Sequence, residues 1–394
     1  MCRYLDIHSR INRIMRVIST ERLPIKLWLD GIEENALQQA KNIANLPFAY
    51  KWIAIMPDSH SGYGMPIGGV LATKQVIIPN CVGVDIGCGM MAVRTSLSEI
   101  DTDTLKSIMS QVRTVIPLGF SHQKEDQQWD GFNDAPDISI IQRELSSSRK
   151  QLGTLGGGNH FIEIQMGSDG YVWLMLHSGS RNFGLKTATE YHKKALRLCE
   201  KWHSMLPDKE LAFLPIESDE GAEYYDAMKY CLKFAQANRD LMMARIETIV
   251  HDITGATIDE RVNIHHNYAA IENHYGENVF VHRKGATKAT LGLAGIIPGS
   301  MGTSSYIVEG LGNPESFMSC SHGAGRSMGR KQAIRELNLE DEQRKMEGIV
   351  HELWDKSNLD EAPGSYKDID TVMANQADLV KVKVHLKPLA VIKG

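Results

Sequence analysis

The sequence predicts an α+β fold, a single large domain in which mixed β-sheets are flanked by helices and a pocket is built from glycine-rich loops. Three observations predict it: short β-rich runs alternate with turns over residues 20–120, a long amphipathic helical pattern covers residues 221–253, and glycine-rich segments recur along the chain. The length of 394 residues also allows two fused lobes. No repeat or clear linker divides the chain, so we expect one continuous domain over residues 1–394.

In the first third of the chain, short apolar runs bounded by turns predict buried strands at residues 52–56, 82–86 and 90–94. Asp85 and Cys88 would then lie at the end of one strand and in the turn after it. Residues 122–137 are polar and poorly periodic, which predicts a long surface loop. A short helix is expected to end at residues 146–150.

A β-hairpin is expected next, because two β-rich runs at residues 161–165 and 171–177 are separated by Gly167-Ser168-Asp169-Gly170. His160 and His177 would lie at the outer ends of its two strands. Those ends are neighbours in a hairpin, so the two imidazoles would be about 5 Å apart or slightly further on a diagonal. Two imidazoles at that spacing can share one metal ion.

The second half of the chain is predicted to mix helices with strands. Thr187-x-x-Glu190 has the pattern of a capping box that opens a helix through about residue 205, and the apolar stripe of residues 221–253 is typical of a core helix. The remaining expected elements are a strand at 278–283, a glycine-rich region at 285–325, helices at 327–337 and 340–354, a half-buried strand at 379–386 and an apolar tail at 388–394.

Composition limits the function classes. The chain is 42% hydrophobic and 23% charged, as in ordinary globular proteins, and its net charge of −5 provides no overall basic field for a nucleic acid, which would need a local patch of lysines and arginines. Six cysteines without C-x-x-C spacing favour a reducing compartment. Charges interrupt the apolar character of residues 1–16, and residues 76–93 are too polar to span a bilayer. We therefore expect a cytoplasmic protein that does not act in a membrane.

Five short segments, four of them containing glycine, each present a histidine, cysteine or carboxylate. Glycine lets a ligand approach the main chain closely, so a ligand-type side chain between glycines indicates a site. The segments are Asp85-Ile86-Gly87-Cys88-Gly89, Gly156-Gly157-Gly158-Asn159-His160, His177-Ser178-Gly179-Ser180-Arg181, His265-His266-Asn267 and Ser321-His322-Gly323-Ala324-Gly325.

These segments supply oxygen, sulfur and nitrogen donors for divalent metals, namely Asp85, Cys88, His160, His177 and His266. By donor type alone, zinc is the first choice. Five donors exceed one tetrahedral set, so a pair of metals bridged by Cys88 is attractive, and two metals suit phosphoryl chemistry. The alternative is structural, because a lone buried cysteine usually packs and a lone histidine is usually a satisfied polar residue.

His322 is a candidate nucleophile. A neutral imidazole attacks phosphorus and later leaves, and Arg326 four residues on would offset the charge on a transferring phosphoryl group. A general base or a further metal ligand is the rival role for this histidine. The glycines of residues 156–159 and 298–302 are suited to phosphate-binding backbone nests, although such clusters are more often plain turns.

Taken together, the segments resemble the RtcB family of RNA-splicing ligases over residues 56–394. The first matching motifs are Met56-Pro57-Asp58-Ser59-His60, Gly62-Tyr63-Gly64-Met65-Pro66-Ile67-Gly68-Gly69, Gly83-Val84-Asp85-Ile86-Gly87-Cys88-Gly89-Met90 and Gly157-Gly158-Asn159-His160-Phe161-Ile162-Glu163. The others are His177-Ser178-Gly179-Ser180-Arg181, His266-Asn267-Tyr268, Arg283-Lys284-Gly285-Ala286, Pro298-Gly299-Ser300-Met301-Gly302, Ser321-His322-Gly323-Ala324-Gly325-Arg326 and Val391-Ile392-Lys393-Gly394.

The resemblance implies an RtcB-like domain that acts as a GTP- and manganese-dependent ligase. Its partners would be RNA 3′-phosphate or 2′,3′-cyclic phosphate ends, RNA 5′-hydroxyl ends and an archease-type accessory protein. His322 would attack the α-phosphate of GTP and form a histidine guanylate, GMP would pass to the RNA 3′-phosphate, and the 5′-hydroxyl would displace it. The process served would be tRNA splicing or RNA repair.

The same resemblance assigns roles to residues. Two Mn²⁺ ions would be held by Asp85, Cys88, His160, His177 and His266, in place of zinc. Arg181 and Arg326 would contact RNA or phosphate. GTP or GMP would contact Asn159, His160, Phe161, Ile162, Glu163, His266, Asn267, Pro298, Gly299, Ser300, Met301, Ser305, His322, Gly323, Ala324, Gly325 and Lys393.

The chain departs from the family pattern in residues 1–50, which are shorter and divergent, and at Asn182, where glycine is more usual after the arginine. Ile264 stands where some members have cysteine. The divergent start and the 122–137 loop can reshape an RNA groove. Two other function classes remain: an RNA-end guanylyltransferase or metal-dependent phosphodiesterase that does not seal, and a catalytically silent RNA-binding protein, which would have lost His322 or a metal donor.

Overall fold

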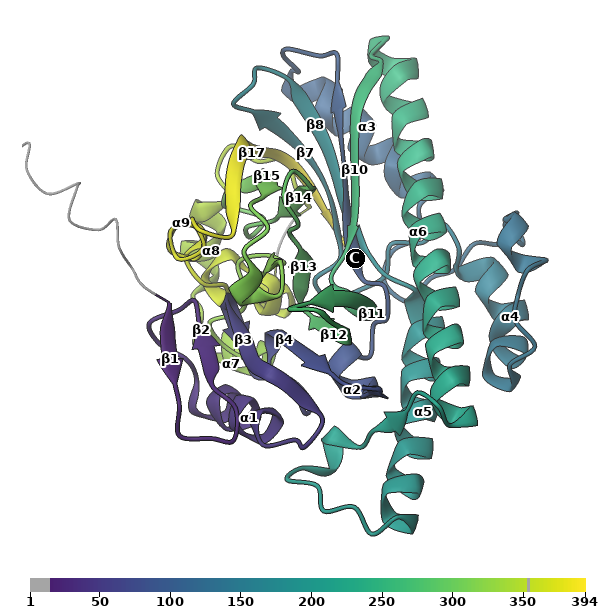
Figure 1. Ribbon diagram of the computed structural model, residues 1–394. Coiled ribbons are helices and arrows are strands. Elements are labelled where there is room, and N and C mark those ends of the chain that lie inside the picture. Colours follow the sequence, from purple (N-terminus) through teal and green to yellow (C-terminus); the bar gives the residue numbers. More distant parts are fainter. Residues whose placement is uncertain (1–14, 353–354) are drawn as a thin grey trace, which may run out of the picture.

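The computed structural model describes residues 15–352 and 355–394, so the predictions for the first fourteen residues and Cys2 lie outside the described part. A seven-stranded and a six-stranded β-sheet lie one above the other and are flanked by helices (Figure 1). Neighbouring strands of the larger sheet are antiparallel, whereas the smaller sheet contains one parallel pair, β2 with β3. The predicted α+β class with mixed sheets is confirmed.

The strands fall into four sheets. The seven-stranded sheet has the order β10 (Ile258–His265), β6 (Gly89–Thr95), β8 (Val172–Ser178), β7 (Phe161–Gly167), β17 (Val380–Lys393), β15 (Ser305–Gly310) and β14 (Ala294–Ile297). The six-stranded sheet has the order β1 (Arg16–Ile18), β2 (Ile25–Leu27), β3 (Ala49–His60), β4 (Ile67–Thr73), β12 (Glu277–Lys284) and β11 (Asn267–His274). Two short pairs are β13 (Ala286–Lys288) with β16 (Ser319–Ser321) and β5 (Val76–Ile77) with β9 (Leu214–Pro215).

The helices of the described residues vary widely in length. The α-helices are α1 (Glu34–Ala44), α2 (Pro79–Val82), α3 (Thr102–Val115), α4 (Ser139–Gln151), α5 (Arg181–Lys201), α6 (Asp219–Thr254), α7 (Arg330–Glu336), α8 (Leu339–Lys345) and α9 (Ile369–Ala374). Short 3₁₀ helices occur at Asp130–Phe132, Lys209–Leu211, Pro314–Ser316, Lys356–Glu361 and Pro363–Ser365. None of the helices in the described ranges is long and apolar enough to cross a membrane.

Helix α6 runs alongside both sheets (Figure 1). Ser218 caps its start by accepting a hydrogen bond from the Gly221 amide, which contributes about 1 kcal/mol, and Gly255 ends it in a left-handed conformation with φ of 74°. The apolar stripe predicted from the sequence is buried, with Met242 and Ile246 packed under the seven-stranded sheet. The prediction that this stripe belongs to the core is confirmed.

Two predictions about element positions are wrong. Residues 82–86 form no strand, because Pro79 starts the short helix α2 and Gly83 then turns the chain with φ of 101°, so that strand β6 begins only at residue 89. The helix predicted to open at Thr187 begins six residues earlier. Thr187 lies inside α5, where its hydroxyl donates to the Phe183 carbonyl instead of capping.

Other predictions differ in extent. The 122–137 segment is largely irregular, yet Phe132 within it is buried in the core, so it is not wholly a surface loop. Helix α8 ends well before the predicted position 354. Gly348, with φ of 84°, turns the chain after it. Residues 353–354 are outside the described ranges. The final strand β17 absorbs the predicted tail, and its register shifts between Pro388 and Ala390 because proline lacks the amide proton for the ladder.

Candidate functional site

Potential metal donors gather at one edge of the seven-stranded sheet, the edge formed by the ends of its strands. Cys88 immediately precedes β6, His160 immediately precedes β7, and His177 is the second-last residue of β8. Because β10, β6, β8 and β7 are antiparallel neighbours, the starts of β6 and β7 meet the ends of β10 and β8. His266 is the one residue between β10 in this sheet and β11 in the other. The chain therefore crosses between the two sheets at this edge.

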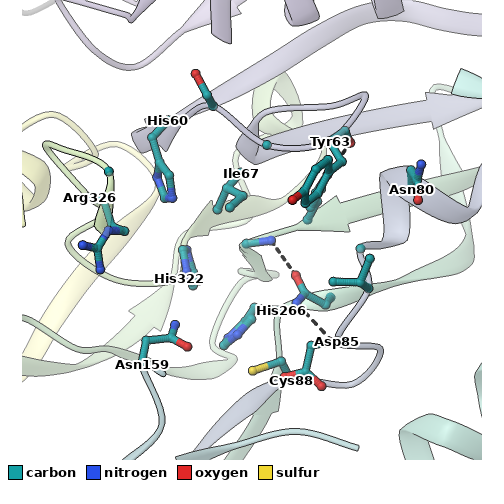
Figure 2. Close-up of a pocket in the computed structure, with 18 of the residues that line it drawn as sticks. His60, Tyr63, Ile67, Asn80, Asp85, Cys88, Asn159, His266, His322 and Arg326 are labelled. Carbon is teal, nitrogen blue, oxygen red and sulfur yellow. Dashed lines mark hydrogen bonds between the residues drawn. The ribbon is translucent and has the colours of Figure 1, made fainter. Parts of the chain in front are cut away.

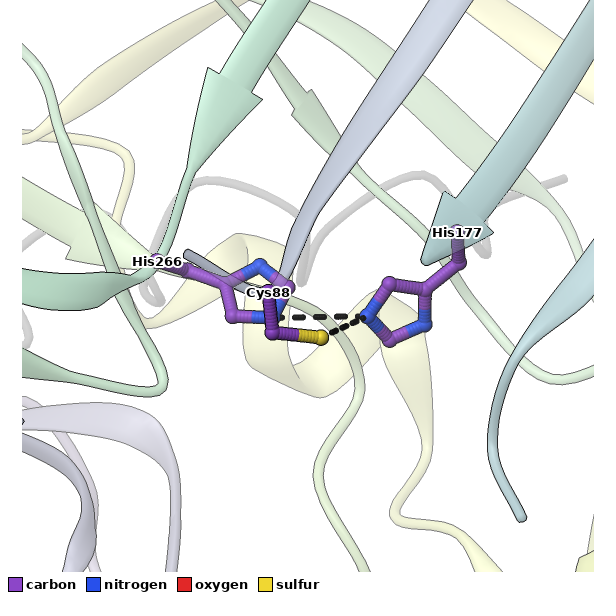
Figure 3. A group of neighbouring side chains, drawn as sticks. All are labelled: Cys88, His177 and His266. Atoms are coloured by element: carbon purple, nitrogen blue, oxygen red, sulfur yellow. Dashed lines mark hydrogen bonds between the residues drawn. The ribbon is translucent and has the colours of Figure 1, made fainter. Parts of the chain in front are cut away.

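The donor atoms converge on the Cys88 sulfur. Its Sγ lies 3.4 Å from His160 Nε2 and 3.2 Å from His177 Nε2, and His177 Nε2 lies 3.3 Å from His266 Nε2 (Figure 3). Asp85 Oδ2 is 3.3 Å from His160 Nε2. The rings of His160 and His177 are 5.1 Å apart, which confirms the adjacency predicted from the hairpin.

These five side chains form two donor groups that share Cys88. One group is Cys88, His177 and His266, and the other is Asp85, Cys88 and His160; in each group all ligand atoms lie within 4.8 Å of one another. This is the division between two metals that a bridging cysteine requires.

The tautomers of the histidines fit metal ions better than a hydrogen-bond network. His160 Nδ1 lies 2.9 Å from the Leu155 carbonyl and His177 Nδ1 lies 3.1 Å from the Asn159 carbonyl. A carbonyl only accepts, so each Nδ1 carries the proton and each Nε2 turns a lone pair toward Cys88. The Cys88 thiol can donate its single proton to only one of these Nε2 atoms, whereas metal ions can bind the lone pairs of all of them.

The burial of the donor cluster also favours the binding of metal ions. Burial lowers the pKa of His177 and His266 well below the usual range, which keeps both imidazoles in the neutral form that binds metals. Burial raises the pKa of the Cys88 thiol, and a bound cation would reverse this by stabilising the thiolate. Burial also opposes the charge of Asp85, but its contacts with His160 and Cys88 and the nearby charge of Arg181 outweigh burial and lower the Asp85 pKa.

Arg239 of α6 fastens the loops that carry the donors. Its guanidinium donates to the carbonyls of Gly87 and Ser178 at 3.0 Å each and to Asn263 Oδ1 at 2.9 Å. Burial lowers the pKa of Arg239 to about 10, so it remains charged at neutral pH. One buried cation thereby connects the turn before β6, the end of β8 and strand β10.

Arg181, a predicted phosphate contact, lies beside the donor cluster. Its guanidinium donates to Thr154 Oγ1 at 3.1 Å and to the Gly119 carbonyl at 3.2 Å, and it lies 3.4 Å from His160 Nδ1. It is not among the side chains that line the two cavities described below, whereas Arg326 lines both.

His322, the predicted nucleophile, is held by Asp58. His322 Nδ1 lies 2.6 Å from Asp58 Oδ2, and the His322 backbone amide donates to the same oxygen at 3.1 Å. Asp58 has no exposed surface, so the carboxylate fixes both the position and the tautomer of the ring. The ring of His322 is 4.8 Å from that of His266, which places the nucleophile candidate next to the donor cluster.

Two cavities meet at His322. The larger, of about 590 Å³, runs past Asp85, Cys88 and His266 (Figure 2), and the smaller, of about 300 Å³, extends toward Glu163. Both are lined by His60, Ile67, Asn159, His322, Arg326 and Arg330. The shared lining makes them one continuous space with the imidazole at the junction.

Most residues predicted to contact guanylate line the smaller cavity. They are Asn159, Phe161, Glu163, Pro298, Gly299, Ser300, Met301, His322, Gly323, Ala324, Gly325 and Lys393. His266 and Asn267 line the larger cavity instead. Ile162 packs in the core beneath the seven-stranded sheet. Ser305 lies behind the loop of residues 298–302, where its hydroxyl accepts a hydrogen bond from the Gly299 amide. His160 belongs to the donor cluster.

Glu361 organises the cations of the smaller cavity. Its carboxylate lies 3.2 Å from Arg326 Nη1, 2.7 Å from Arg330 Nη1 and 3.2 Å from Lys393 Nζ, and it also accepts from the Tyr366 hydroxyl. Asp360 Oδ2 also lies 2.8 Å from Arg330 Nη1, so three cations face two carboxylates and leave local positive charge despite the net charge of −5. This is the local patch that the sequence required of a nucleic-acid or nucleotide partner.

Glu163 is expected to make the stability of the folded protein depend on pH. Burial raises the pKa of this carboxyl from 4.5 to about 8, so the folded protein retains a proton that the unfolded chain has lost between these values. Glu163 therefore costs stability as pH rises through that window. Glu163→Gln is expected to gain thermal stability relative to wild type between about pH 5 and pH 8. Thermal unfolding monitored by circular dichroism measures this, with exposed Glu99→Gln as control; a difference independent of pH contradicts it.

Several side chains in the site were not assigned from the sequence, namely Asp58, His60, Arg239, Lys284 and Glu361. The first two lie two residues apart on β3 and so on one face of the strand, a signal that the sequence contains. Arg239 and Glu361 carry no local signal, because their roles depend on segments far away in the chain.

The fold and the site together define an enzyme of the α+β class in which a Cys/His/Asp cluster suited to metal ions adjoins a carboxylate-oriented histidine. Residues 39–135 and 127–394 match the model of the family described as "tRNA-splicing ligase RtcB". The chain belongs to the RtcB family, and the resemblance seen in its motifs is confirmed.

Curated relatives match over nearly the whole chain. The "RNA-splicing ligase RtcB" of Escherichia coli (strain K12) is 41% identical over 411 residues, covering 96% of this chain and 99% of the relative. The "tRNA-splicing ligase RtcB" of Pyrobaculum aerophilum is 32% identical, with 95% of each chain covered. The "RNA-splicing ligase RtcB homolog 1" of Entamoeba dispar is 33% identical, with 91% of this chain and 82% of the relative covered.

Proposed function

We propose that this chain is a GTP- and manganese-dependent RNA ligase. It joins RNA ends bearing a 3′-phosphate or 2′,3′-cyclic phosphate to ends bearing a 5′-hydroxyl, in tRNA splicing or RNA repair. The observation that carries the proposal is His322, which stands where the donor cluster and the two cavities meet. The family membership and the names of the relatives support the same activity.

The first step is guanylation of His322. The hydrogen bond to Asp58 keeps the proton on Nδ1, so the Nε2 lone pair attacks the α-phosphorus of GTP. The bond from that phosphorus to the bridging oxygen breaks, and pyrophosphate leaves with the electron pair. Asp58 also stabilises the positive charge that develops on the imidazole.

The second and third steps transfer the guanylate and seal the RNA. Where the end is a 2′,3′-cyclic phosphate, water first adds to its phosphorus and the bond to the 2′-oxygen breaks, which leaves a 3′-phosphate. An oxygen of the RNA 3′-phosphate attacks the phosphorus on His322, and the neutral imidazole leaves. The RNA 5′-hydroxyl then attacks the activated 3′-phosphate and loses its proton, a phosphodiester bond forms, and GMP departs. Arg326 and Arg330 line both cavities and are placed to offset phosphate charge throughout.

Two Mn²⁺ ions would be held by Asp85, Cys88, His160, His177 and His266 and, when bound, would polarise phosphate oxygens and offset their charge. The donor chemistry by itself also suits zinc. Metal analysis of the active protein distinguishes the two. A Cys88 thiolate has to remain reduced, which favours the cytoplasm as the site of action.

A joining assay tests the function. The protein is incubated with GTP, Mn²⁺ and a nicked stem-loop RNA that carries 2′,3′-cyclic phosphate and 5′-hydroxyl ends. A longer RNA is expected. A guanylated RNA end without joining would support an end-capping guanylyltransferase, and shortened or dephosphorylated RNA would support a phosphodiesterase. Multiple turnover that depends on an added archease-type protein would identify that partner.

Asp58 is a positioning residue, and its removal has a specific consequence. Asp58→Asn is expected to slow guanylation about 100-fold or more, because the uncharged amide no longer fixes the tautomer or stabilises the charged imidazole. Initial rates of protein labelling with α-labelled GTP measure this across pH. Asp103→Asn, which alters an exposed carboxylate of α3, is the control. An unchanged rate in Asp58→Asn would remove Asp58 from the mechanism.

A further inference from the structure

Tyr63 presents an exposed aromatic ring inside the larger cavity. It lies in the loop between β3 and β4, lines the same cavity as Asp85 and His322, and 66% of its surface is accessible. Figure 2 shows the ring projecting into the space across from Asp85 and His266. Over the described ranges, no residue stacks on this ring or hydrogen-bonds to its hydroxyl.

The backbone that carries Tyr63 is held firmly. The Gln39 side-chain amide donates to the Gly62 carbonyl at 2.5 Å and accepts from the Gly62 amide at 3.1 Å. The Lys284 ammonium donates to the Tyr63 carbonyl at 2.5 Å and to the Met65 carbonyl at 3.0 Å. The ring is therefore presented to the cavity from a fixed backbone, with most of the residue's surface accessible.

A pre-positioned, unpartnered aromatic ring suits a flat ligand. Nucleobases stack on aromatic side chains in proteins that bind single-stranded RNA, and the energy gained does not require a particular base. The smaller cavity holds the residues proposed for guanylate, so the larger one is left for the RNA ends. Those ends must reach His322 from the side on which Tyr63 stands.

We infer that the ring of Tyr63 stacks on the nucleobase of an RNA-terminal nucleotide and so holds that end for joining. This inference rests on the proposed ligase function and adds a residue that selects for an unpaired, base-bearing end. The base belongs to the 3′-phosphate end or to the 5′-hydroxyl end. The chemistry of the contact is the same for both.

The test measures how joining depends on RNA concentration for guanylated wild type, Tyr63→Ala, Tyr63→Phe and Tyr63→Trp. Base–aromatic stacking contributes about 1–3 kcal/mol, which converts to a roughly 5- to 150-fold rise in the half-saturating RNA concentration for Tyr63→Ala. The Phe and Trp variants should remain within about threefold of wild type. Tyr171→Ala, at the opposite end of the β7–β8 hairpin from the site, is the control.

RNAs with an abasic nucleotide at the 3′-phosphate end or at the 5′-hydroxyl end identify the contact. An abasic nucleotide at the end that contacts Tyr63 should weaken RNA binding by wild type. In Tyr63→Ala the same abasic nucleotide should cause no further weakening of binding. Abasic penalties that persist in full in that variant, an unchanged half-saturating RNA concentration, or a weakened affinity for GTP alone each overturn the stacking inference. Absence of joining by wild type would instead reject the ligase function, and with it this inference.

Discussion

His322→Ala is expected to abolish the transfer of label from α-labelled GTP to the protein. The imidazole Nε2 is the atom proposed to form the bond to the α-phosphorus, and alanine offers no atom in its place. The ring Nδ1 and the backbone amide of His322 both donate to one carboxylate oxygen of Asp58, so the wild-type nucleophile is aligned before GTP arrives. We expect labelling and RNA joining to fall below detection together.

A matched substitution separates this effect from general damage. His122→Ala removes an exposed histidine of the 122–137 segment and should be labelled at the wild-type rate. Thermal unfolding should confirm that both variants are folded. Label that persists on His322→Ala would refute the assignment of the nucleophile, and the bond would then have to be sought on another side chain.

Cys88→Ala is expected to remove bound metal and guanylation in one step. Cys88 belongs to both donor groups, so its loss breaks both sets of ligands. Loss of an outer-shell partner of a metal ligand costs about 10–100-fold in affinity or activity, and loss of a shared ligand should cost more. Metal content after dialysis, measured by plasma mass spectrometry, and labelling with α-labelled GTP provide the two measurements.

The control for this variant is a buried cysteine outside the cluster. Cys199→Ala in α5 removes a thiol of similar burial and should keep both metal and labelling. Cys88→Ser preserves the volume at the site while it replaces the sulfur, so a loss in this variant is chemical. Unchanged metal content in Cys88→Ala would remove Cys88 from the metal site.

How much of the site followed from the sequence depends on how local each contact is. The hairpin placed His160 beside His177 because turn and strand signals lie within a few residues. The approach of His266 to Cys88 depends on the order of strands in two sheets. That order is set by long-range packing, and only the donor types of the two residues and the resemblance to the RtcB family indicated that both belonged to a site.

Contacts between residues far apart in the chain could not be predicted from the sequence. Asp58 and His322 are separated by 264 positions, and only the pairing of folded segments brings their side chains together. The strand predicted at 82–86 failed because Val82 ends a short helix and a glycine turn follows it, and apolar content alone does not distinguish this arrangement from a strand. The α+β class was predictable, because strand and helix periodicities recur throughout the chain.

The most direct test is a crystal structure of the protein with Mn²⁺ and a GTP analogue that resists attack at the α-phosphorus, with anomalous scattering recorded for the metal. We predict manganese peaks between the side chains of residues 85, 88, 160, 177 and 266, and the α-phosphate of the analogue facing His322 Nε2. Peaks bound elsewhere, or an analogue whose α-phosphate lies away from that nitrogen, would contradict the account.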